Sequence, residues 1–376
     1  MTDKVKAAVM VGPGQVELRE YDKPELGRKD IWLKVDYAGI CGTDKHYYLG
    51  HSKLAKPVVL GHEIVGTIAA LGSEANDAMI VSSGPLKEGD RVAVAPSPAG
   101  CGRCWSCLNL PLHPNYCPNK GFPAYGFTPV DRPPHLWGGF AEYLYVQPDS
   151  FLFKIEDGMS TEVAALAEPA TTAITGIAKI FRPGIPLQGE GFGPGSSVIV
   201  LGVGPIGLLA VAMAKYSGAA TVFAVDLLDS RLQLARDMGA DVLVNAGQTS
   251  LEERVQSVRE QTEGMGCDVL IETAGVPAVF AEGLQYLRRG GVYLEIGHFT
   301  DPGGVEVHPH AICRGEFTIH GTFGYPPMMF KPALSFLRDT QAPVEELVTH
   351  TLKLEDIVQA LKLAGTAGTC KVLIAP

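Results

Sequence analysis

The segment SVIVLGVGPIGLLAVAMAKYSG, residues 197–218, decides the fold of this chain. It begins with a short run of apolar and β-branched residues, which is typical of a buried strand. A glycine-rich turn follows, and the apolar, alanine-containing run after it predicts a helix. A strand, a tight turn and a helix in this order predict the first βα unit of a parallel sheet.

The residues that follow repeat this alternation of strand and helix. Further strands are predicted at TVFAVD (221–226), DVLVN (241–245), CDVLIETAG (267–275), GGVYLEIG (290–297) and EFTIHGTF (316–323). Helices are predicted at SRLQLARDMGA (230–240) and LEERVQSVREQTEG (251–264). The fold class is therefore α/β, with a doubly wound, parallel, six-stranded sheet of the Rossmann type.

The rest of the chain has another character. Short alternating runs such as IWLKVDYAG (31–39), EIVGTIAAL (63–71) and DRVAVAP (90–96) predict a β-rich, partly antiparallel, barrel-like domain over residues 1–168. After residue 323, amphipathic helices are predicted at 330–339 and 354–364, with a last strand at 369–376. We expect three segments, 1–168, 169–323 and 324–376, with a cysteine-rich lobe at about 98–120.

Bulk properties limit the possible functions. A net charge of -10 gives no basic footprint for nucleic acid or an anionic membrane surface, so a small-molecule partner is expected. The start, MTDKVKAAVM, lacks the apolar run of a secretory signal, which favours a cytoplasmic location. The apolar run at 198–214 is broken by glycine and proline and does not read as a membrane span. In a reducing compartment, the eight cysteines are expected to be ligands or core residues.

The turn after the first predicted strand carries a GxGxxG pattern. Its glycines are Gly202, Gly204 and Gly207, with Pro205 and Ile206 between the last two. The first glycine allows a tight turn, the second lets the backbone approach a pyrophosphate, and the third lets helix and strand pack closely. The pattern indicates a dinucleotide site at the positive end of the helix, the alternative being an ordinary glycine-rich turn.

The next strand ends in Asp226, nineteen residues after Gly207. A carboxylate there accepts hydrogen bonds from the adenosine ribose and repels a 2'-phosphate, so NAD is predicted rather than NADP. Arg231 is a second candidate for contact with this ribose, although a solvated residue at a helix start is an equally good interpretation.

The stretch CGRCWSCLNLPLHPNYC, residues 101–117, contains four closely spaced thiols: Cys101, Cys104, Cys107 and Cys117. CxxC turns let two sulfurs converge on one ion, and four thiolates close a tetrahedral zinc site. The prediction is a structural zinc. A disulfide pair and a metal-free loop are alternatives, and His113 is a less favoured substitute for Cys117.

A second metal site is suggested by residues that lie far apart in the sequence. AGICGTDKHYYLGH (38–51) supplies Cys41, LGHEIVG (60–66) supplies His62, and AALAEPATTA (164–173) supplies Glu168. Three protein ligands leave the fourth position of a zinc ion open, as catalysis requires. An alcohol bound there would lose its proton more easily, and an alkoxide releases hydride readily.

Four neighbouring residues are given catalytic roles. The Thr43 hydroxyl both donates and accepts, so it can pass a proton from the alcohol towards the cofactor ribose, and His46 can pass it on to water. Asp44 would orient the imidazole of His62. Glu63 would lie beside the metal, as a supporting group or an occasional ligand.

These motifs, CGTDKH, GHEIVG, the four-cysteine lobe and GxGxxG, occur in this order over nearly the whole chain. In them the sequence resembles the zinc-containing medium-chain dehydrogenase/reductases. The resemblance implies a GroES-like catalytic domain to which residues 324–376 return, a Rossmann NAD-binding domain, two zinc ions per chain, and dimers or tetramers. It also implies roles for Cys41, His62 and Glu168 as ligands, Thr43 and His46 as the relay, and Asp226 as the ribose contact.

Within this family, Glu-Pro at 168–169, CGTDKHYY and GPIG are most similar to the polyol and threonine dehydrogenase branch. Three features depart from that branch: the wide spacing between Cys107 and Cys117, the insertion at 74–92, and the tripeptide FGY at 323–325. Sorbitol dehydrogenases carry Phe-Arg-Tyr in place of this FGY.

We expect an NAD-dependent alcohol dehydrogenase acting on a secondary alcohol, with a sorbitol-type polyol or threonine as alternative substrates. An inactive nucleotide-binding relative, acting as a sensor or structural protein, is the alternative of another class. Substrate-pocket candidates are mostly aromatic, which suits an apolar or cyclic alcohol at least as well as an open polyol: Tyr47, Tyr48, Phe122, Phe127, Trp137, Phe299, Tyr325 and Met328. His298 is a candidate for contact with cofactor or substrate.

Overall fold

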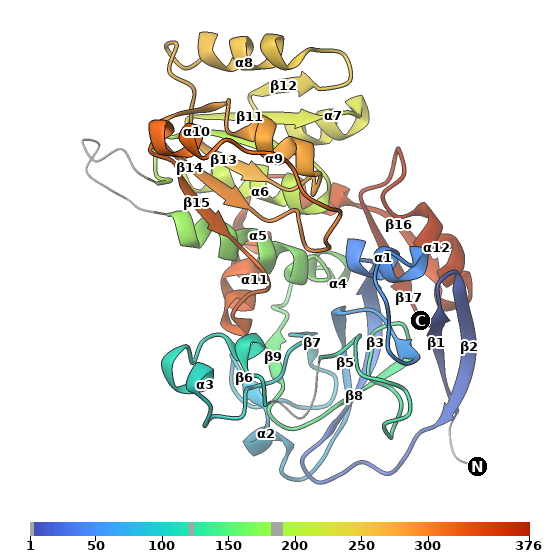
Figure 1. Cartoon of the computed structure of the whole chain (residues 1–376). Coiled ribbons are helices and arrows are strands. Elements are labelled where there is room, and N and C mark those ends of the chain that lie inside the picture. The colour runs from blue at the N-terminus through green and yellow to red at the C-terminus, as the bar shows by residue number, and fades with distance from the viewer. Residues whose placement is uncertain (1–3, 120–123, 182–190) are drawn as a thin grey trace. The chain divides into compact units, whose positions relative to one another are not determined.

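The computed structural model describes residues 4–119, 124–181 and 191–376 (Figure 1). The chain divides into two compact units. Unit 1 comprises Met1–Glu168, Tyr325–Arg338 and Val348–Pro376, and unit 2 comprises Pro169–Gly324 and Asp339–Leu347. From the sequence, residues 339–347 are expected in the last segment, whereas the structure places them in unit 2. They contain a short 3-10 helix, η3 (Val344–Leu347), and such a helix has no sequence periodicity that would mark a domain boundary.

Unit 2 is built on one six-stranded sheet. Its strands are β10 (Ser197–Leu201), β11 (Thr221–Asp226), β12 (Val242–Asn245), β13 (Cys267–Glu272), β14 (Leu287–Glu295) and β15 (Thr318–Gly321). They lie in the order β12-β11-β10-β13-β14-β15, and every neighbouring pair is parallel. The parallel six-stranded sheet predicted from the alternating pattern is therefore confirmed.

Helices connect these strands. They are α6 (Pro205–Tyr216), α7 (Asp229–Asp237), α8 (Leu251–Glu260), α9 (Pro277–Gly283) and α10 (Pro309–Gly315), and α5 (Ala167–Ile180) precedes β10. Almost every residue of α6 after its first turn is buried, up to Ala214, because this helix packs against β10, β11 and β13. Figure 1 shows α8 beyond β12, at one edge of the sheet.

The strand order reverses beside β10. From β10 the chain moves outward through β11 to β12, and it then crosses back to β13 on the other side of β10. In open parallel sheets, the carboxyl ends of the strands at such a reversal form the crevice that binds a ligand. The glycine-rich turn after β10 lies at this crevice.

Unit 1 contains two sheets. The smaller one has the order β2-β1-β4, with β1 (Lys4–Gly12), β2 (Gln15–Asp22) and β4 (Val58–Val59). The larger follows the path β16-β17-β3-β5-β7-β9-β6, with β8 also paired to β3. Its strands are β3 (Ile31–Gly39), β5 (Glu63–Leu71), β6 (Ile80–Val81), β7 (Arg91–Val94), β8 (Tyr143–Val146), β9 (Phe151–Lys154), β16 (Val348–Lys353) and β17 (Lys371–Ala375).

Most pairs in the larger sheet are antiparallel, and β17 brings the end of the chain to the edge of β3. The helices of this unit are short: α1 (Gly42–Leu49), α2 (Ala75–Ala78), α3 (Trp105–Asn109), η1 (Pro114–Tyr116), α4 (Thr161–Ala164), η2 (Pro327–Met329), α11 (Phe330–Asp339), η4 (Leu354–Asp356) and α12 (Ile357–Leu363). A continuous apolar core extends from β1 to β17. The returning strand is thus part of the same core as the first strand.

In the part of the chain that the structure describes, no helix combines the length and the apolar character that a membrane crossing needs.

A buried ion pair links two helices of unit 2, and it allows a test of the packing. Arg254 of α8 donates to both carboxylate oxygens of Glu282 at 2.9 and 2.8 Å and to the Tyr286 hydroxyl at 3.0 Å. Replacing Arg254 with Met should lower the free energy of unfolding by about 3 kcal/mol, because Glu282 loses its partner in a mostly buried place.

The measurement is urea unfolding followed by far-UV circular dichroism. Arg289→Met removes an exposed pair with Glu316 and should cost less than about 1 kcal/mol. Equal losses in the two variants would show that burial of the Arg254 pair contributes nothing.

Candidate functional site

The glycine turn after β10 has the shape that a dinucleotide requires. Gly202 has φ +81, which side chains rarely adopt, and a Cβ on Gly207 would lie 2.1 Å from the Gly202 carbonyl oxygen. A Cβ on Gly204, by contrast, would meet no protein atom within 4 Å. Gly202 and Gly207 are thus required by the protein's own packing, whereas the space above Gly204 is open to a ligand.

The same turn begins helix α6. Gly204 is the N-cap, and Pro205 and Ile206 are the first helical residues. Proline is well placed here, because its missing N–H would have no partner in the first turn of a helix. The free backbone N–H groups of this turn and the helix dipole favour an anion, as a pyrophosphate is.

Asp226 joins two loops of the crevice. One carboxylate oxygen accepts from the Val203 N–H at 2.9 Å, and the other accepts from the Leu228 N–H at 3.0 Å. The side chain is buried, and the Arg231 guanidinium lies 3.9 Å from it. Asp226 therefore holds the glycine turn in place, and Arg231 lies close to it.

The four thiols of the lobe come together. Their sulfur atoms all lie within 4.8 Å of one another, and the sulfurs of Cys104 and Cys117 are 3.8 Å apart. The four lobe cysteines are thiols in the structure and are not joined in disulfides. Backbone N–H groups point at the sulfurs: Cys101 N–H donates to Cys117 Sγ at 3.3 Å, and Cys107 N–H to Cys104 Sγ at 3.4 Å.

These donors favour the thiolate forms of Cys101 and Cys117, whose pKa values are both lowered. The backbone N–H of Arg103 is the main cause that lowers the pKa of Cys101 to about 6, whereas burial raises the pKa of Cys107 to about 12. His113 stacks on the ring of Tyr116 at 4.7 Å and is outside the group of four sulfurs.

Helix α1 arranges the residues that follow Cys41. Cys41 is the N-cap, and its N–H donates to the Asp44 carboxylate at 2.9 Å, which closes a capping box. The Thr43 hydroxyl lies 3.6 Å from the Cys41 sulfur. Thr43 and His46 are three residues apart and therefore share one face of the helix. The sequence analysis assigned roles to these residues but did not predict this helix.

His62 is buried and close to acidic groups. Its Nδ1 lies 3.7 Å from Asp44 Oδ1 and has no hydrogen-bond partner in the described part of the chain. Burial lowers the pKa of this imidazole, but Asp44 and Cys41 outweigh burial and raise the pKa well above its ordinary value. The site therefore attracts positive charge.

Glu168 approaches the same place from the first turn of α5. Burial raises the pKa of this carboxyl to about 6, and it interacts electrostatically with His62 and Glu63. The Tyr325 hydroxyl donates to Glu168 Oε1. Tyr325 was predicted as a pocket residue, and the structure shows that it holds the Glu168 carboxyl.

Glu63 is paired with a lysine that the sequence analysis did not identify. The Lys371 ammonium, at the start of β17, donates to the two Glu63 oxygens at 2.6 and 2.7 Å and to the Ile40 carbonyl oxygen at 3.2 Å. Glu63 follows His62 and Ile40 precedes Cys41, so Lys371 fixes the backbone beside both residues. No local pattern marks this pair, because its members are 308 residues apart.

The ligand atoms of Cys41, His62 and Glu168 are less tightly gathered than the lobe sulfurs. Among the described residues, groups of three or more ligand atoms that all lie within 4.8 Å of one another occur in two places, and this trio is not one of them. The second such group consists of Glu272, Glu295 and His298, of which only His298 was singled out from the sequence.

His46 has an imidazole neighbour. Its Nδ1 lies 3.1 Å from Nδ1 of His51, which is exposed. Burial, with the nearby His51 and Lys45, lowers the pKa of His46. The pair forms a chain of groups that leads from α1 towards solvent.

The predicted substrate residues divide into several groups. Phe127 packs between His62 and Tyr47, at ring distances of 5.1 and 6.1 Å. Tyr48 and Trp137 belong to the apolar core. Phe299 and Met328 are exposed, and Phe122 lies outside the described residues.

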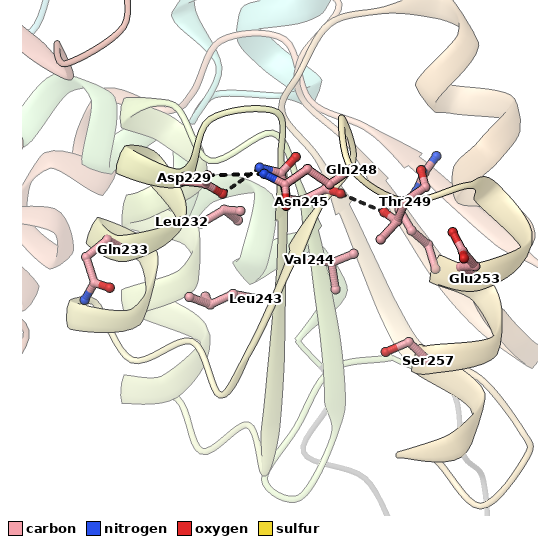
Figure 2. A pocket seen from close by; sticks show the side chains of 11 residues that line it. Asp229, Leu232, Gln233, Leu243, Val244, Asn245, Gln248, Thr249, Glu253 and Ser257 are labelled. Carbon is pink, nitrogen blue, oxygen red and sulfur yellow. Dashed lines mark hydrogen bonds between the residues drawn. The ribbon is translucent and has the colours of Figure 1, made fainter.

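A separate pocket of about 450 Å³ lies between α7, β12 and α8. Figure 2 shows Asp229 joined there to Asn245, whose amide donates to it at 2.6 Å. None of the residues predicted from the sequence to be functional lines this pocket.

A dinucleotide-type sheet, together with a β-rich unit that carries thiol, imidazole and carboxyl groups of the kinds that bind zinc, indicates a class, the zinc- and nicotinamide-dependent dehydrogenases. Residues 27–157 match the family model described as "Alcohol dehydrogenase GroES-like domain", and residues 205–339 match "Zinc-binding dehydrogenase".

Known proteins agree with these matches. A sorbitol dehydrogenase of Bacillus subtilis is 35% identical, with 96% of this chain and 93% of that protein covered. The crystal structure of an alcohol dehydrogenase from Thermotoga maritima matches with a TM-score of 0.90 and 27% identity, covering 100% of both chains. That of a zinc-binding dehydrogenase from Sinorhizobium meliloti, bound to NADP, matches with a TM-score of 0.84 and 28% identity over 100% of both chains.

The chain belongs to the zinc-containing medium-chain dehydrogenases, in the branch of the polyol dehydrogenases. It is an enzyme, a zinc-dependent oxidoreductase that acts on alcohols with a nicotinamide cofactor. The resemblance drawn from the sequence motifs is confirmed, and an inactive sensor or structural protein is not favoured.

The Lys371–Glu63 pair can be tested by removing one charge or both. Lys371→Met should lower the free energy of unfolding by about 3–5 kcal/mol, because the Glu63 carboxylate would stay buried without a partner. The double variant Glu63→Gln/Lys371→Met should recover a large part of this loss.

Urea unfolding followed by tryptophan fluorescence measures the effect, since Trp32, Trp105 and Trp137 all belong to unit 1. A double variant no more stable than the single one would contradict the charge argument.

Proposed function

We propose that the protein transfers a hydride from a secondary alcohol to NAD⁺, with a catalytic zinc held by Cys41, His62 and Glu168. The observation that carries the proposal is the acidic surrounding of the buried His62, beside a helix that presents Thr43 and His46. Family membership supports it, because the matched model is that of a zinc-binding dehydrogenase.

The donor set fits zinc. A thiolate, an imidazole and a carboxylate are all ligands that zinc accepts, and three protein ligands leave a position for substrate. One Zn²⁺ with one thiolate and one carboxylate sums to a charge of about zero, which suits a buried site. His62 Nδ1 faces Asp44, and this arrangement supports Asp44 as the group that orients the imidazole.

Zinc, when bound, would lower the pKa of an alcohol hydroxyl. The chain's own residues would then move the released proton. Thr43 accepts and donates through one hydroxyl, 3.6 Å from the Cys41 sulfur. His46 receives the proton next, and its lowered pKa favours prompt release. His51, 3.1 Å away and exposed, offers the route from His46 to water.

Glu63 and Lys371 would support this site without touching the substrate. Their buried pair holds the backbone beside Cys41 and His62, so the two side chains keep their positions when the substrate changes. The Tyr325 hydroxyl does the same for Glu168.

A second, structural zinc is proposed for the lobe. The four convergent sulfurs and the backbone N–H groups directed at them support a closed tetrahedral thiolate site.

NAD is proposed as the cofactor. The Gly202, Gly204 and Gly207 turn would cradle the pyrophosphate, and Asp226 would accept hydrogen bonds from the ribose hydroxyls. Arg231 lies 3.9 Å from Asp226 and would contact the same ribose.

The substrate is proposed to be a secondary alcohol with an apolar body, because the rings of Phe127 and Tyr47 pack beside His62. An open polyol is the second candidate. The similarity to a sorbitol dehydrogenase favours it, and so does the carboxyl–tyrosine pair of Glu168 and Tyr325, which can bond additional hydroxyls.

The protein is further proposed to be a cytoplasmic homo-oligomer, a tetramer or a dimer. Exposed apolar side chains on and around α3 support self-association, since such groups gain by leaving water: Trp105, Leu108, Leu110, Leu112 and Tyr116.

The two zinc roles can be separated by matched cysteine variants. Cys41→Ser should lower kcat/KM for alcohol oxidation by at least about a thousandfold, because Lewis-acid activation is worth several kcal/mol. Cys104→Ser should lose one zinc, with a much smaller effect on chemistry.

The measurements are metal content after dialysis and NADH absorbance with a panel of cyclic secondary alcohols, polyols and amino alcohols. The exposed Cys313→Ser variant is the control and should keep both zincs and full activity. Full activity in Cys41→Ser would refute the catalytic zinc.

Cofactor choice tests the role of Asp226. The unmodified enzyme should prefer NAD⁺ over NADP⁺ by about 100-fold in kcat/KM, equivalent to roughly 2.7 kcal/mol of repulsion. Asp226→Asn keeps an acceptor for the Val203 N–H but removes the charge, so the preference should fall by about tenfold. Equal or reversed values in the unmodified enzyme would rule out the charge argument.

A further inference from the structure

Three ionisable side chains of unit 2 form a cluster for which the proposed reaction has no use. Glu272 ends β13 and Glu295 ends β14, and the two residues are partners in the parallel register of these strands. His298 follows three residues after Glu295. The cluster lies at the carboxyl edge of the sheet, where Glu272 also pairs in register with Leu201 at the end of β10.

The ligand atoms of these side chains are close. His298 Nδ1 lies 2.9 Å from Glu295 Oε1 and 3.5 Å from Glu272 Oε2, and one atom of each residue lies within 4.8 Å of the other two. For zinc with nitrogen and oxygen ligands, the edge of the coordination tetrahedron is about 3.4 Å long. The spacing from His298 to Glu272 is close to this value.

The two carboxyl groups have unused oxygens. Glu272 is fully buried, and its Oε1 accepts from the N–H groups of Ala274 and Gly275 at 2.8 and 2.9 Å. Its Oε2 is buried without a hydrogen-bond partner, as is Oε2 of Glu295, among the residues described. A buried acceptor without a partner is costly and calls for an explanation.

The space around Glu272 Oε2 is kept free by a glycine. A Cβ on Gly297 would lie 2.4 Å from this oxygen, so a side chain at position 297 would push the carboxyl away from the cluster. The absence of a side chain at position 297 thus lets this oxygen face His298 Nδ1, which is 3.5 Å away.

The cluster is acidic and, among the residues that the structure describes, has no basic partner other than His298. In the described part of the chain, Glu272 and Glu295 both face His298, and no lysine or arginine forms an ion pair with either carboxyl. Two carboxyl groups side by side in a mostly buried place repel one another whenever both are ionised, which is unfavourable.

We propose that Glu272, Glu295 and His298 form a third metal site, for a divalent cation such as Zn²⁺, distinct from the lobe and from the Cys41 site. One divalent ion neutralises both carboxylates and uses the two unpartnered oxygens, while a neutral imidazole supplies the third ligand. The donors are oxygen and nitrogen without thiolate, so this site binds zinc more weakly than the thiolate sites do and fills when zinc is supplied.

The ion would connect two neighbouring strand ends to the loop after β14. That loop lies at the same edge of the sheet as the glycine turn, so occupancy is expected to stiffen one wall of the cofactor crevice.

The test uses the full-length enzyme, dialysed until its zinc content is constant, and then titrated calorimetrically with Zn²⁺ alone. The unmodified protein should bind one additional equivalent. Glu295→Gln and His298→Gln should weaken this binding at least about tenfold, because each removes a ligand. Glu306→Gln and His308→Gln are matched controls, since these side chains are 89% and 84% exposed, and they should bind zinc like the unmodified protein.

Two results would overturn the proposal: no additional equivalent in the unmodified protein, or unchanged binding in a folded Glu295→Gln or His298→Gln variant. The zinc content before titration reports the thiolate sites separately, so a failure of those sites is distinguishable. Should both variants fail to fold by circular dichroism, anomalous diffraction at the zinc edge from crystals of the zinc-loaded protein decides. A peak between Glu272, Glu295 and His298 supports the site, and its absence there refutes it.

Discussion

The buried pair of Lys371 and Glu63 is the interaction on which the structure of unit 1 depends. Their side chains are 3% and 1% exposed, so neither charge can be satisfied by water. Because the ammonium also bonds the Ile40 carbonyl, the pair joins the last strand of the chain to the residues beside Cys41 and His62. If the two side chains were separated, each would leave an unpaired charge in the core. The free-energy cost of such a charge keeps the returning strand β17 in its place.

Unit 2 stabilises its buried carboxylates in a different way. Asp226 receives one backbone N–H on each oxygen, so the negative charge is stabilised by the loops that it orders. Glu272 receives two N–H groups on one oxygen only, and its other oxygen lies 3.5 Å from His298 Nδ1. Burial and the neighbouring Glu295 raise the pKa of Glu272 to about 8. The two acids thus occupy the same edge of one sheet but differ in how completely they are satisfied.

The two thiol-containing sites differ in how they are assembled. The lobe takes four sulfurs from one stretch of 17 residues, so its geometry depends mainly on local turns and backbone N–H groups. The proposed Cys41 site takes its members from three separate segments, and each has a different partner: a helix cap for Cys41, Asp44 for His62, and Tyr325 for Glu168. Such a site depends on the packing of the whole unit.

The sequence by itself determined the features that rest on local spacing. Alternating strands and helices gave the parallel sheet, GxGxxG gave the turn after β10, and the CxxC pattern gave the lobe, because each requires only residues that are near one another in the chain. Only the tertiary structure decided that Lys371 pairs with Glu63, that Tyr325 bonds Glu168, and that Glu272 faces Glu295. These contacts join residues whose separation leaves no periodic signal, and they form because burial forces each charged or polar group to find a partner wherever the fold brings one.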